Sequence, residues 1–158
     1  MPSSTARKGD RKLDLEHFLP YRLSVLSNRV SDAIAREYSD RFGLSIPEWR
    51  VMAVLGGTSG LSARDVADRT AMDKVQVSRA VDSLVRVRRV ARAEDAEDGR
   101  VSRLGLTAKG RAIYDEVVPL ALHLEEVFQS ALRPEERRQL DALMVKLTRQ
   151  AYLLGGGK

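Results

Sequence analysis

The residues best suited to binding chemistry lie close together, between Lys74 and Arg92. This stretch holds six basic residues and a single acid, Asp82. Its apolar residues recur at helical spacing and would bury one face of a helix: Val77, Ala80, Val81 and Leu84. The other face then presents ammonium, amide, hydroxyl and guanidinium groups near the helix start, from Lys74, Gln76, Ser78 and Arg79. Such groups hydrogen-bond base edges and phosphates in the major groove of DNA. On this stretch alone, a solvated amphipathic helix without a ligand is the alternative.

The segment before this helix would place it for such a role. Asp73 is a predicted N-cap, with Gln76 three residues later to complete a capping box. A second capping sequence, Ser62 to Asp65, opens a short helix that ends near Thr70. A short helix, a tight turn and a helix with a polar N-terminal face make a helix-turn-helix. The neighbouring segment therefore favours the DNA-binding interpretation.

A hairpin is predicted directly after the basic helix. Residues 89–93 and 100–106 have the composition and alternation of two strands, joined by the acidic sequence EDAEDG. Carboxylates at a loop tip would repel DNA phosphates. We therefore expect Asp95 or Asp98 to hold Arg100 in place rather than to face DNA.

Long amphipathic helices are predicted on both sides of this central region. Apolar residues at steps of three and four mark helices over residues 13–42 and 134–154, and further helices begin near residues 46 and 107. Gly43 would stop the first helix, while Ser45 and Thr107 would cap the second and the fifth. Pro119 should bend the fifth helix, which we expect to reach about Leu132.

The two apolar stripes at the chain ends cannot both be covered by the central region. The economical solution is a two-fold dimer built from residues 13–44 and 107–154, around a DNA-binding domain of residues 45–106. Residues 1–12 are predicted to be a disordered basic arm. A monomeric helical bundle is the alternative. The predicted fold is mainly α with a small β-hairpin wing, that is, a winged helix-turn-helix with dimerisation helices at both ends.

The composition excludes several classes of function. The chain of 158 residues carries a formal charge of +5, which permits an anionic partner, and it contains no cysteine. Thiol catalysis and zinc–thiolate sites are therefore excluded. The two histidines, His17 and His123, lack metal-ligand spacing, and no nucleophile or phosphate-loop motif occurs. We expect no enzyme activity, no cofactor and no bound metal. With no signal peptide and no apolar run long enough to span a bilayer, we expect a cytoplasmic protein.

The chain resembles the MarR family of regulators from Leu13 to Leu154. The resemblance rests on four stretches: SIPEWRVMAVL, LSARDVADRTAMDKVQVSRAVDSLV, AEDAEDGRVSRLGLTAKGR and LRPEERRQLDALMVKL. It implies a homodimer that binds palindromic double-stranded operators, usually as a repressor that a small molecule releases. A fixed repressor or activator with no effector is the alternative function.

The resemblance also implies roles for individual residues. Gln76, Ser78 and Arg79 match positions that read or flank bases in the major groove, and Arg100 matches the wing arginine that enters the minor groove. Three further residues would hold phosphates: Lys74, Arg86 and Arg103. The chain departs from the family pattern twice. Arg88 stands where many members have glycine, and Gly99 replaces the first of two wing arginines.

The effector region that the resemblance implies lies where the first, second and fifth helices meet the DNA-binding lobe. Here it offers five candidate residues: His17, Arg22, Ser27, Trp49 and Arg50. A cation beside an aromatic ring suits an aromatic carboxylate. The segment HFLPYRLSVLSNRVS resembles members that answer phenolic or hydroxycinnamic acids or their coenzyme A thioesters. The alternative places Trp49 in the core and Arg22 in a surface or dimer ion pair.

Overall fold

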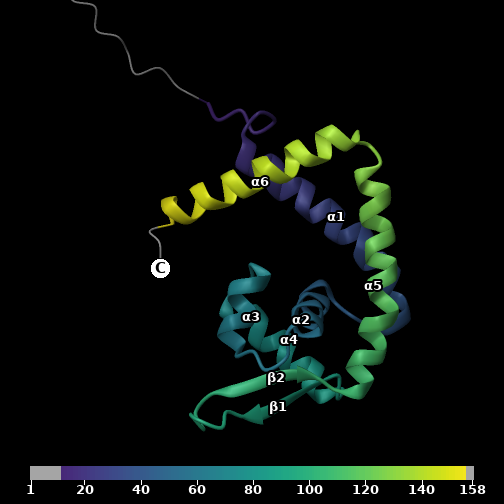
Figure 1. The fold of residues 1–158 in the computed structure, drawn as a ribbon, viewed down its shortest axis with the longest axis vertical. Helices are drawn as coiled ribbons and strands as arrows, with labels where there is room; N and C mark the ends of the chain where they lie inside the picture. Colours follow the sequence, from purple (N-terminus) through teal and green to yellow (C-terminus); the bar gives the residue numbers. More distant parts are fainter. Residues whose placement is uncertain (1–11, 156–158) are drawn as a thin grey trace, which may run out of the picture.

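Six helices and one hairpin make up residues 12–155, the part of the chain that the computed structural model describes (Figure 1). In chain order they are α1 (Leu19–Phe42), α2 (Ile46–Gly57), α3 (Ala63–Thr70), α4 (Lys74–Arg86), β1 (Val90–Glu94), β2 (Ser102–Leu106), α5 (Ala108–Gln129) and α6 (Pro134–Leu154). The predicted fold class, mainly helical with a small hairpin wing, is confirmed. The predicted basic arm lies almost wholly outside the described residues.

Side-chain caps set where the helices begin. At α2, the Ser45 hydroxyl accepts the Glu48 N–H and the Glu48 carboxylate accepts the Ser45 N–H, so the predicted capping box is present. At α4, the Asp73 carboxylate accepts the Gln76 N–H at 2.8 Å, as predicted. Within the described residues the Gln76 side chain makes no return bond, so this box is half formed and leaves the amide of Gln76 free.

The first helix is shorter than its apolar pattern predicts. It begins at Leu19 rather than Leu13, because Asp14 closes a separate turn by accepting the Glu16 N–H at 3.1 Å and contacting the His17 ring at 2.8 Å. Pro20 then lies in the first turn of α1, where its missing N–H costs nothing. At the other end, Gly43 adopts φ 59 and stops the helix, as predicted. The fifth helix passes through Pro119 and ends at Gln129, three residues before the predicted Leu132.

The core lies between α2, α3, α4 and the hairpin, and α5 with the C-terminal half of α1 closes it. Among its fully buried side chains are Val51, Met52, Leu55, Val66, Val77, Val81 and Leu84. The hairpin is antiparallel, with Val90 opposite Leu106. An isolated bridge between Leu61 and Leu104 joins it to the loop before α3, through two N–H···O bonds of 2.8 Å. The hairpin is therefore hydrogen-bonded directly to the loop that precedes α3.

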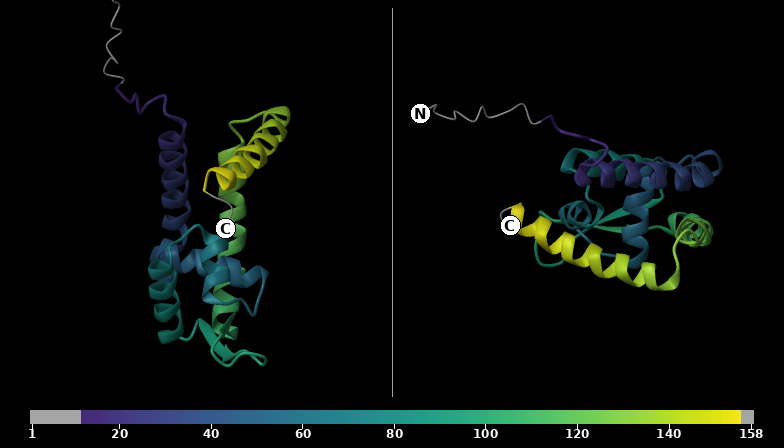
Figure 2. Two further views of the ribbon diagram at one scale, coloured as in Figure 1. Left: turned by 90° about the vertical axis from the view of Figure 1, so that its left-hand side faces the viewer. Right: turned by 90° about the horizontal axis from the view of Figure 1, so that it is seen from above.

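Helix α6 and the N-terminal half of α1 lie outside this core. No residue of α6 is buried, and α6 is separated from the N-terminal half of α1 in both views of Figure 2. Their apolar stripes are exposed, including Leu19, Leu23 and Leu26 on α1 and Leu140, Leu143 and Leu147 on α6. Among residues 12–155, no helix combines the length and apolar character needed to cross a membrane.

Among residues 12–155, two residues other than glycine adopt left-handed backbone conformations. Ala71, at φ 53, ends α3 and makes the tight turn of the helix-turn-helix. Arg88, at φ 59, makes the turn from α4 into β1. At this second turn the carbonyl of Arg88 accepts the Thr107 hydroxyl at 2.7 Å. The left-handed turn expected from the family pattern is therefore kept without a glycine, at a cost in backbone strain.

Candidate DNA-binding interface

The outer face of α4 carries the polar residues that the sequence singles out. Val77, Ala80, Val81 and Leu84 are buried against the core, whereas Lys74, Gln76, Ser78 and Arg79 are all exposed. Arg86, the last residue of the helix, is also exposed. The structure thus gathers five of the seven predicted DNA-binding residues on one helix, with their side chains open to solvent.

An acidic residue lies on the same side of α4. Asp82 is 63% exposed and its carboxylate accepts a hydrogen bond from Arg92 of β1 at 2.5 Å. The pair links α4 to β1 and neutralises a negative charge that would otherwise repel phosphate. Sequence analysis counted both residues but could not pair them.

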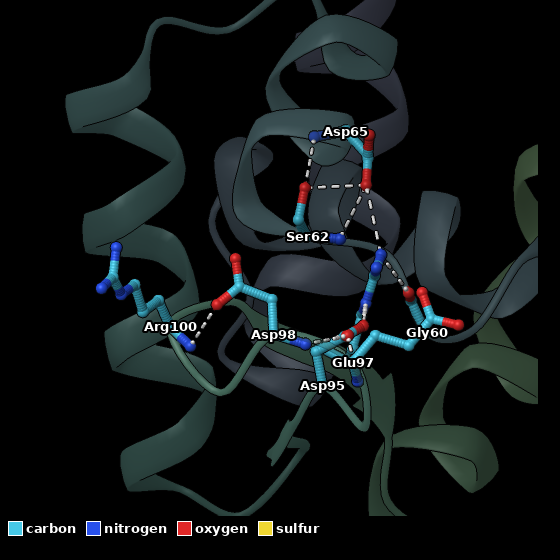
Figure 3. A network of polar contacts seen from close by, with 8 residues as sticks. Gly60, Ser62, Asp65, Asp95, Glu97, Asp98 and Arg100 are labelled. Atoms are coloured by element: carbon cyan, nitrogen blue, oxygen red, sulfur yellow. Dashed lines mark hydrogen bonds and ion pairs between the residues drawn. The ribbon is translucent and has the colours of Figure 1, made fainter.

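In the acidic loop between the strands, aspartate carboxylates accept hydrogen bonds from backbone N–H groups of the same loop (Figure 3). Asp95 accepts the N–H groups of Glu97 and Asp98, both at 2.9 Å, and Asp98 accepts the Arg100 N–H at 3.0 Å. The expectation that Asp98 holds Arg100 is confirmed for the main chain. The Arg100 guanidinium extends away from these carboxylates in Figure 3 and pairs with no residue that the structure describes. It is therefore available to a ligand.

Arg103 occupies the base of the wing. Its Nε donates to Asp95 at 2.5 Å and its Nη1 donates to the Gly60 carbonyl at 3.3 Å, while Nη1 lies 3.9 Å from Asp65. Asp65 in turn completes the capping box of α3 with Ser62. Arg103 thus bridges the wing and the start of the helix-turn-helix. The structure thus gives Arg103 a positioning role. Its Nη2 donates to no group in the described residues, so the phosphate contact predicted from the resemblance stays a prediction.

The charge state of this network follows from its hydrogen bonds. The N–H of Asp98, then the Arg103 guanidinium, lower the pKa of Asp95 to about 2. Hydrogen bonds from Ser62 likewise lower the pKa of Asp65. Both carboxylates are therefore ionised at neutral pH and hold Arg103.

The five predicted ligand residues do not form one site. Trp49 is partly buried against the core and packs between Tyr38 and Tyr114, with its ring centroid 5.6 and 6.0 Å from theirs. His17 and Arg22 are exposed, and Arg22 lines a separate hollow near the start of α1. Trp49 lines neither this hollow nor the cleft that holds Arg50, so its contact with a ligand stays a prediction.

Ser27 and Arg50 do come together, in a cleft of about 720 Å³ between α1, α2 and the end of α3. Sequence analysis missed its other polar residues, Ser24, Asn28, Arg69 and Thr70. Arg50 donates to Ser31 at 3.3 Å, and Arg69 donates to Thr58 at 3.3 Å. Two cations in one cleft suit an anion. No local pattern could have found Arg69, because it reaches the cleft from a different helix.

The chain's similarities to known proteins agree with this geometry. Residues 42–101 match a family model described as MarR family. The chain is 28% identical over 113 residues to the HTH-type transcriptional regulator BilQ of Clostridium symbiosum, an alignment that covers 70% of this chain and 78% of BilQ.

Solved structures extend the similarity to nearly the whole chain. A MarR family transcriptional regulator from Silicibacter pomeroyi is 29% identical, with a TM-score of 0.73, over 87% of this chain and 94% of that one. Bordetella bronchiseptica BpsR is 26% identical, with a TM-score of 0.72, over 82% of this chain and 98% of that one. The BpsR structure concerns the regulation of DNA binding by 6-hydroxynicotinic acid.

Proposed function

We propose that this chain is a DNA-binding transcriptional regulator of the MarR family that represses transcription as a homodimer on a near-palindromic operator and is released by a small aromatic carboxylate. The DNA-binding part of this proposal rests on the polar groups that α4 and the wing each present. Helix α4 offers exposed amide, hydroxyl and cationic groups. In the acidic wing loop Asp95 and Asp98 accept backbone N–H groups, and the Arg100 guanidinium pairs with no described residue.

In this proposal α4 enters the major groove and the wing reaches the adjacent minor groove. Gln76, Ser78 and Arg79 contact bases, and Lys74 and Arg86 contact phosphates. Arg100 enters the minor groove, where narrow A·T tracts concentrate negative potential. Arg103 keeps the wing at the angle at which Arg100 can do so.

Dimerisation is supported by the apolar faces that the single chain leaves uncovered. Helix α6 buries no residue, and isolated apolar stripes of this length are unstable in water. A second copy would cover both α1 and α6, and a two-fold axis would set two α4 helices about one turn of DNA apart.

Light scattering at micromolar concentration tests the dimer. Leu147→Glu places a charge in the exposed stripe and should yield monomers. Lys146→Glu changes the neighbouring residue on another face of α6 and should leave the dimer intact. A folded monomer formed by the full parent chain would refute this part of the proposal.

Salt-dependent binding to duplex DNA tests the division of labour. Each phosphate contact contributes about 0.9 to the slope of log affinity against log salt. Arg100→Ala should weaken binding and relax the preference for A·T at the flanks. Gln76→Ala should change the tolerated base within the half-site at a cost of roughly 1–3 kcal/mol. Equal losses for both variants on every sequence would contradict separate roles for helix and wing. Arg36→Ala, on the exposed surface of α1, is the control.

The effector is proposed to bind the cleft that holds Ser27 and Arg50. In this proposal the carboxylate binds Arg50 and Arg69, which line the same cleft, and the aromatic ring packs against its apolar residues Leu23, Ala53 and Val54. A coenzyme A thioester of such an acid is the larger form of the same ligand. The similarity to BpsR supports an aromatic acid. Because the cleft joins α1 to the end of α3, a ligand can favour one position of the DNA-binding lobe, in proportion to its differential affinity.

Trp49 gives this proposal a direct measurement. It is the single tryptophan and precedes Arg50, so its fluorescence should report binding of hydroxybenzoic, hydroxycinnamic and hydroxynicotinic acids. A tenfold release from DNA requires about 1.4 kcal/mol of coupling. Arg50→Gln should keep operator affinity and lose the response, whereas Arg36→Ala should respond as the parent does. If no acid in the panel changes fluorescence or operator affinity, the regulator without an effector is the correct alternative.

A further inference from the structure

We propose that Val75 reads the C5-methyl group of a thymine in each half-site and thereby sets a base preference of this regulator. The inference rests on the proposed role of α4 as the recognition helix. It concerns a residue that the polar pattern of the sequence did not single out, because valine has no group that hydrogen-bonds to DNA.

Val75 occupies the centre of the outer face of α4. Successive residues of a helix are separated by about 100°. Counted from the buried residues Val77, Ala80, Val81 and Leu84, the opposite side of the helix carries Val75, Arg79, Asp82 and Arg86. Gln76 and Lys74 flank Val75, roughly a quarter turn to either side. The side chain that projects farthest from the core in the first turn is therefore an aliphatic one.

Nothing in the described chain uses this side chain. Val75 is 58% exposed and belongs to neither the core nor its partly buried border. The other strongly exposed apolar residues lie mostly before Ser27 and after Ala121, on the helices proposed to dimerise. Between these limits only Val75 and Val87 are large, apolar and exposed in the described structure. A β-branched residue is also a poorer helix former than alanine, so local stability does not explain it.

The residues around Val75 indicate which kind of partner binds this face of α4. Lys74, Arg79 and Arg86 make this face cationic, which suits DNA and disfavours an apolar protein partner. In the major groove, thymine is distinguished by its O4 acceptor and its C5-methyl group, and apolar side chains pack against that methyl. Arg79 follows one turn later on the same side, where it can bond a neighbouring guanine or a phosphate. An apolar contact beside a cationic one makes a two-base recognition element.

Removing one methyl group from the DNA tests the inference. A duplex selected from a random pool with the parent protein supplies the operator. Each thymine is then replaced by deoxyuridine, symmetrically in both half-sites, and affinity is measured by fluorescence anisotropy. Burial of one methyl group is worth about fourfold in affinity, so one symmetric replacement should weaken parent binding about fifteenfold. Replacements elsewhere should have little effect.

Val75→Ala should remove most of this sensitivity at that one position. The ratio between thymine and deoxyuridine duplexes should fall to about twofold, and the variant should melt at or above the parent temperature because alanine favours the helix. Val87→Ala, which shortens the other exposed valine at the end of α4, should keep the parent pattern. If Val75→Ala and the parent show the same penalty at every thymine, the inference is wrong. Failure of the parent to select any duplex would instead refute the DNA-binding proposal itself.

Discussion

Replacing Arg88 with glycine should stabilise the protein. Arg88 has φ 59, and a residue with a Cβ pays roughly 1–2 kcal/mol in the left-handed region. The conformation is held by bonds on both sides, since the Arg88 N–H donates to Val85 at 3.0 Å and its carbonyl accepts from Thr107 at 2.7 Å. The turn therefore cannot relax to a more favourable φ while these bonds persist.

The expected gain is smaller than the strain itself. Glycine also makes the unfolded chain more flexible, which costs about 0.4–1 kcal/mol. The net stabilisation of Arg88→Gly should be about 0.5–1 kcal/mol, or about 1–4 °C in melting temperature for a chain of this size. Arg88→Ala keeps the Cβ and removes only the charge, so it should not be stabilised. Arg88→Asn should fall between them, since asparagine tolerates this region.

Thermal unfolding followed by circular dichroism measures these differences. All variants must be compared at one protein concentration, because the stability of a dimer depends on concentration. An Arg88→Gly protein no more stable than Arg88→Ala would refute the reasoning, since both lack the guanidinium and only glycine relieves the backbone. A gain shared equally by both variants would assign the effect to charge.

Three further predictions concern the core and the wing. A Cβ at Gly56 would lie 2.1 Å from the Tyr114 ring, so Gly56→Ala should destabilise the protein by about 1–3 kcal/mol in urea unfolding. A Cβ at Gly57 would meet open space, so Gly57→Ala should be neutral or stabilising. Arg103→Lys should weaken DNA binding and speed amide exchange at Glu97 and Asp98, because lysine cannot reach Asp95 and Gly60 together. Unchanged amide exchange at Glu97 and Asp98 would contradict the positioning role of Arg103. The pKa of Asp95 is lowered to about 2 in the folded protein, so its contribution to wing order should be complete above its unfolded-state pKa of about 4 and disappear as pH falls toward 2. Loss of amide-exchange protection in the wing at pH 6 would contradict this. Asp95→Asn should show reduced amide-exchange protection at every pH.

Local patterns predicted the elements of this protein well. The helix starts at α2, α4 and α5 follow from single residues, Ser45, Asp73 and Thr107, whose side chains accept an N–H three residues ahead. The error at α1 has the same local origin. The apolar stripe continues upstream of Leu19, but Asp14 forms its own turn and competes with the helix.

The roles of individual side chains depended on segments far apart in the sequence. Arg103 was predicted to hold a phosphate, yet its acceptors come from Gly60, Asp65 and Asp95. Trp49 was placed near a ligand and lies between two tyrosines from α1 and α5. In both cases the residue type was informative, and the partner that decides its use came from another element.

The sequence by itself determined where the helices lie, which face of α4 is buried, and that a cationic, polar surface remains outside. These features depend on backbone geometry within a few residues, where spacing is set by the helix period and by capping bonds. Only the tertiary structure decided that Arg103 is engaged while the Arg100 side chain pairs with no described residue, and that Arg50 and Arg69 share a cleft. The reason is the short range of hydrogen bonds and packing contacts. A side chain's role depends on which distant groups the fold brings within about 3–4 Å of it.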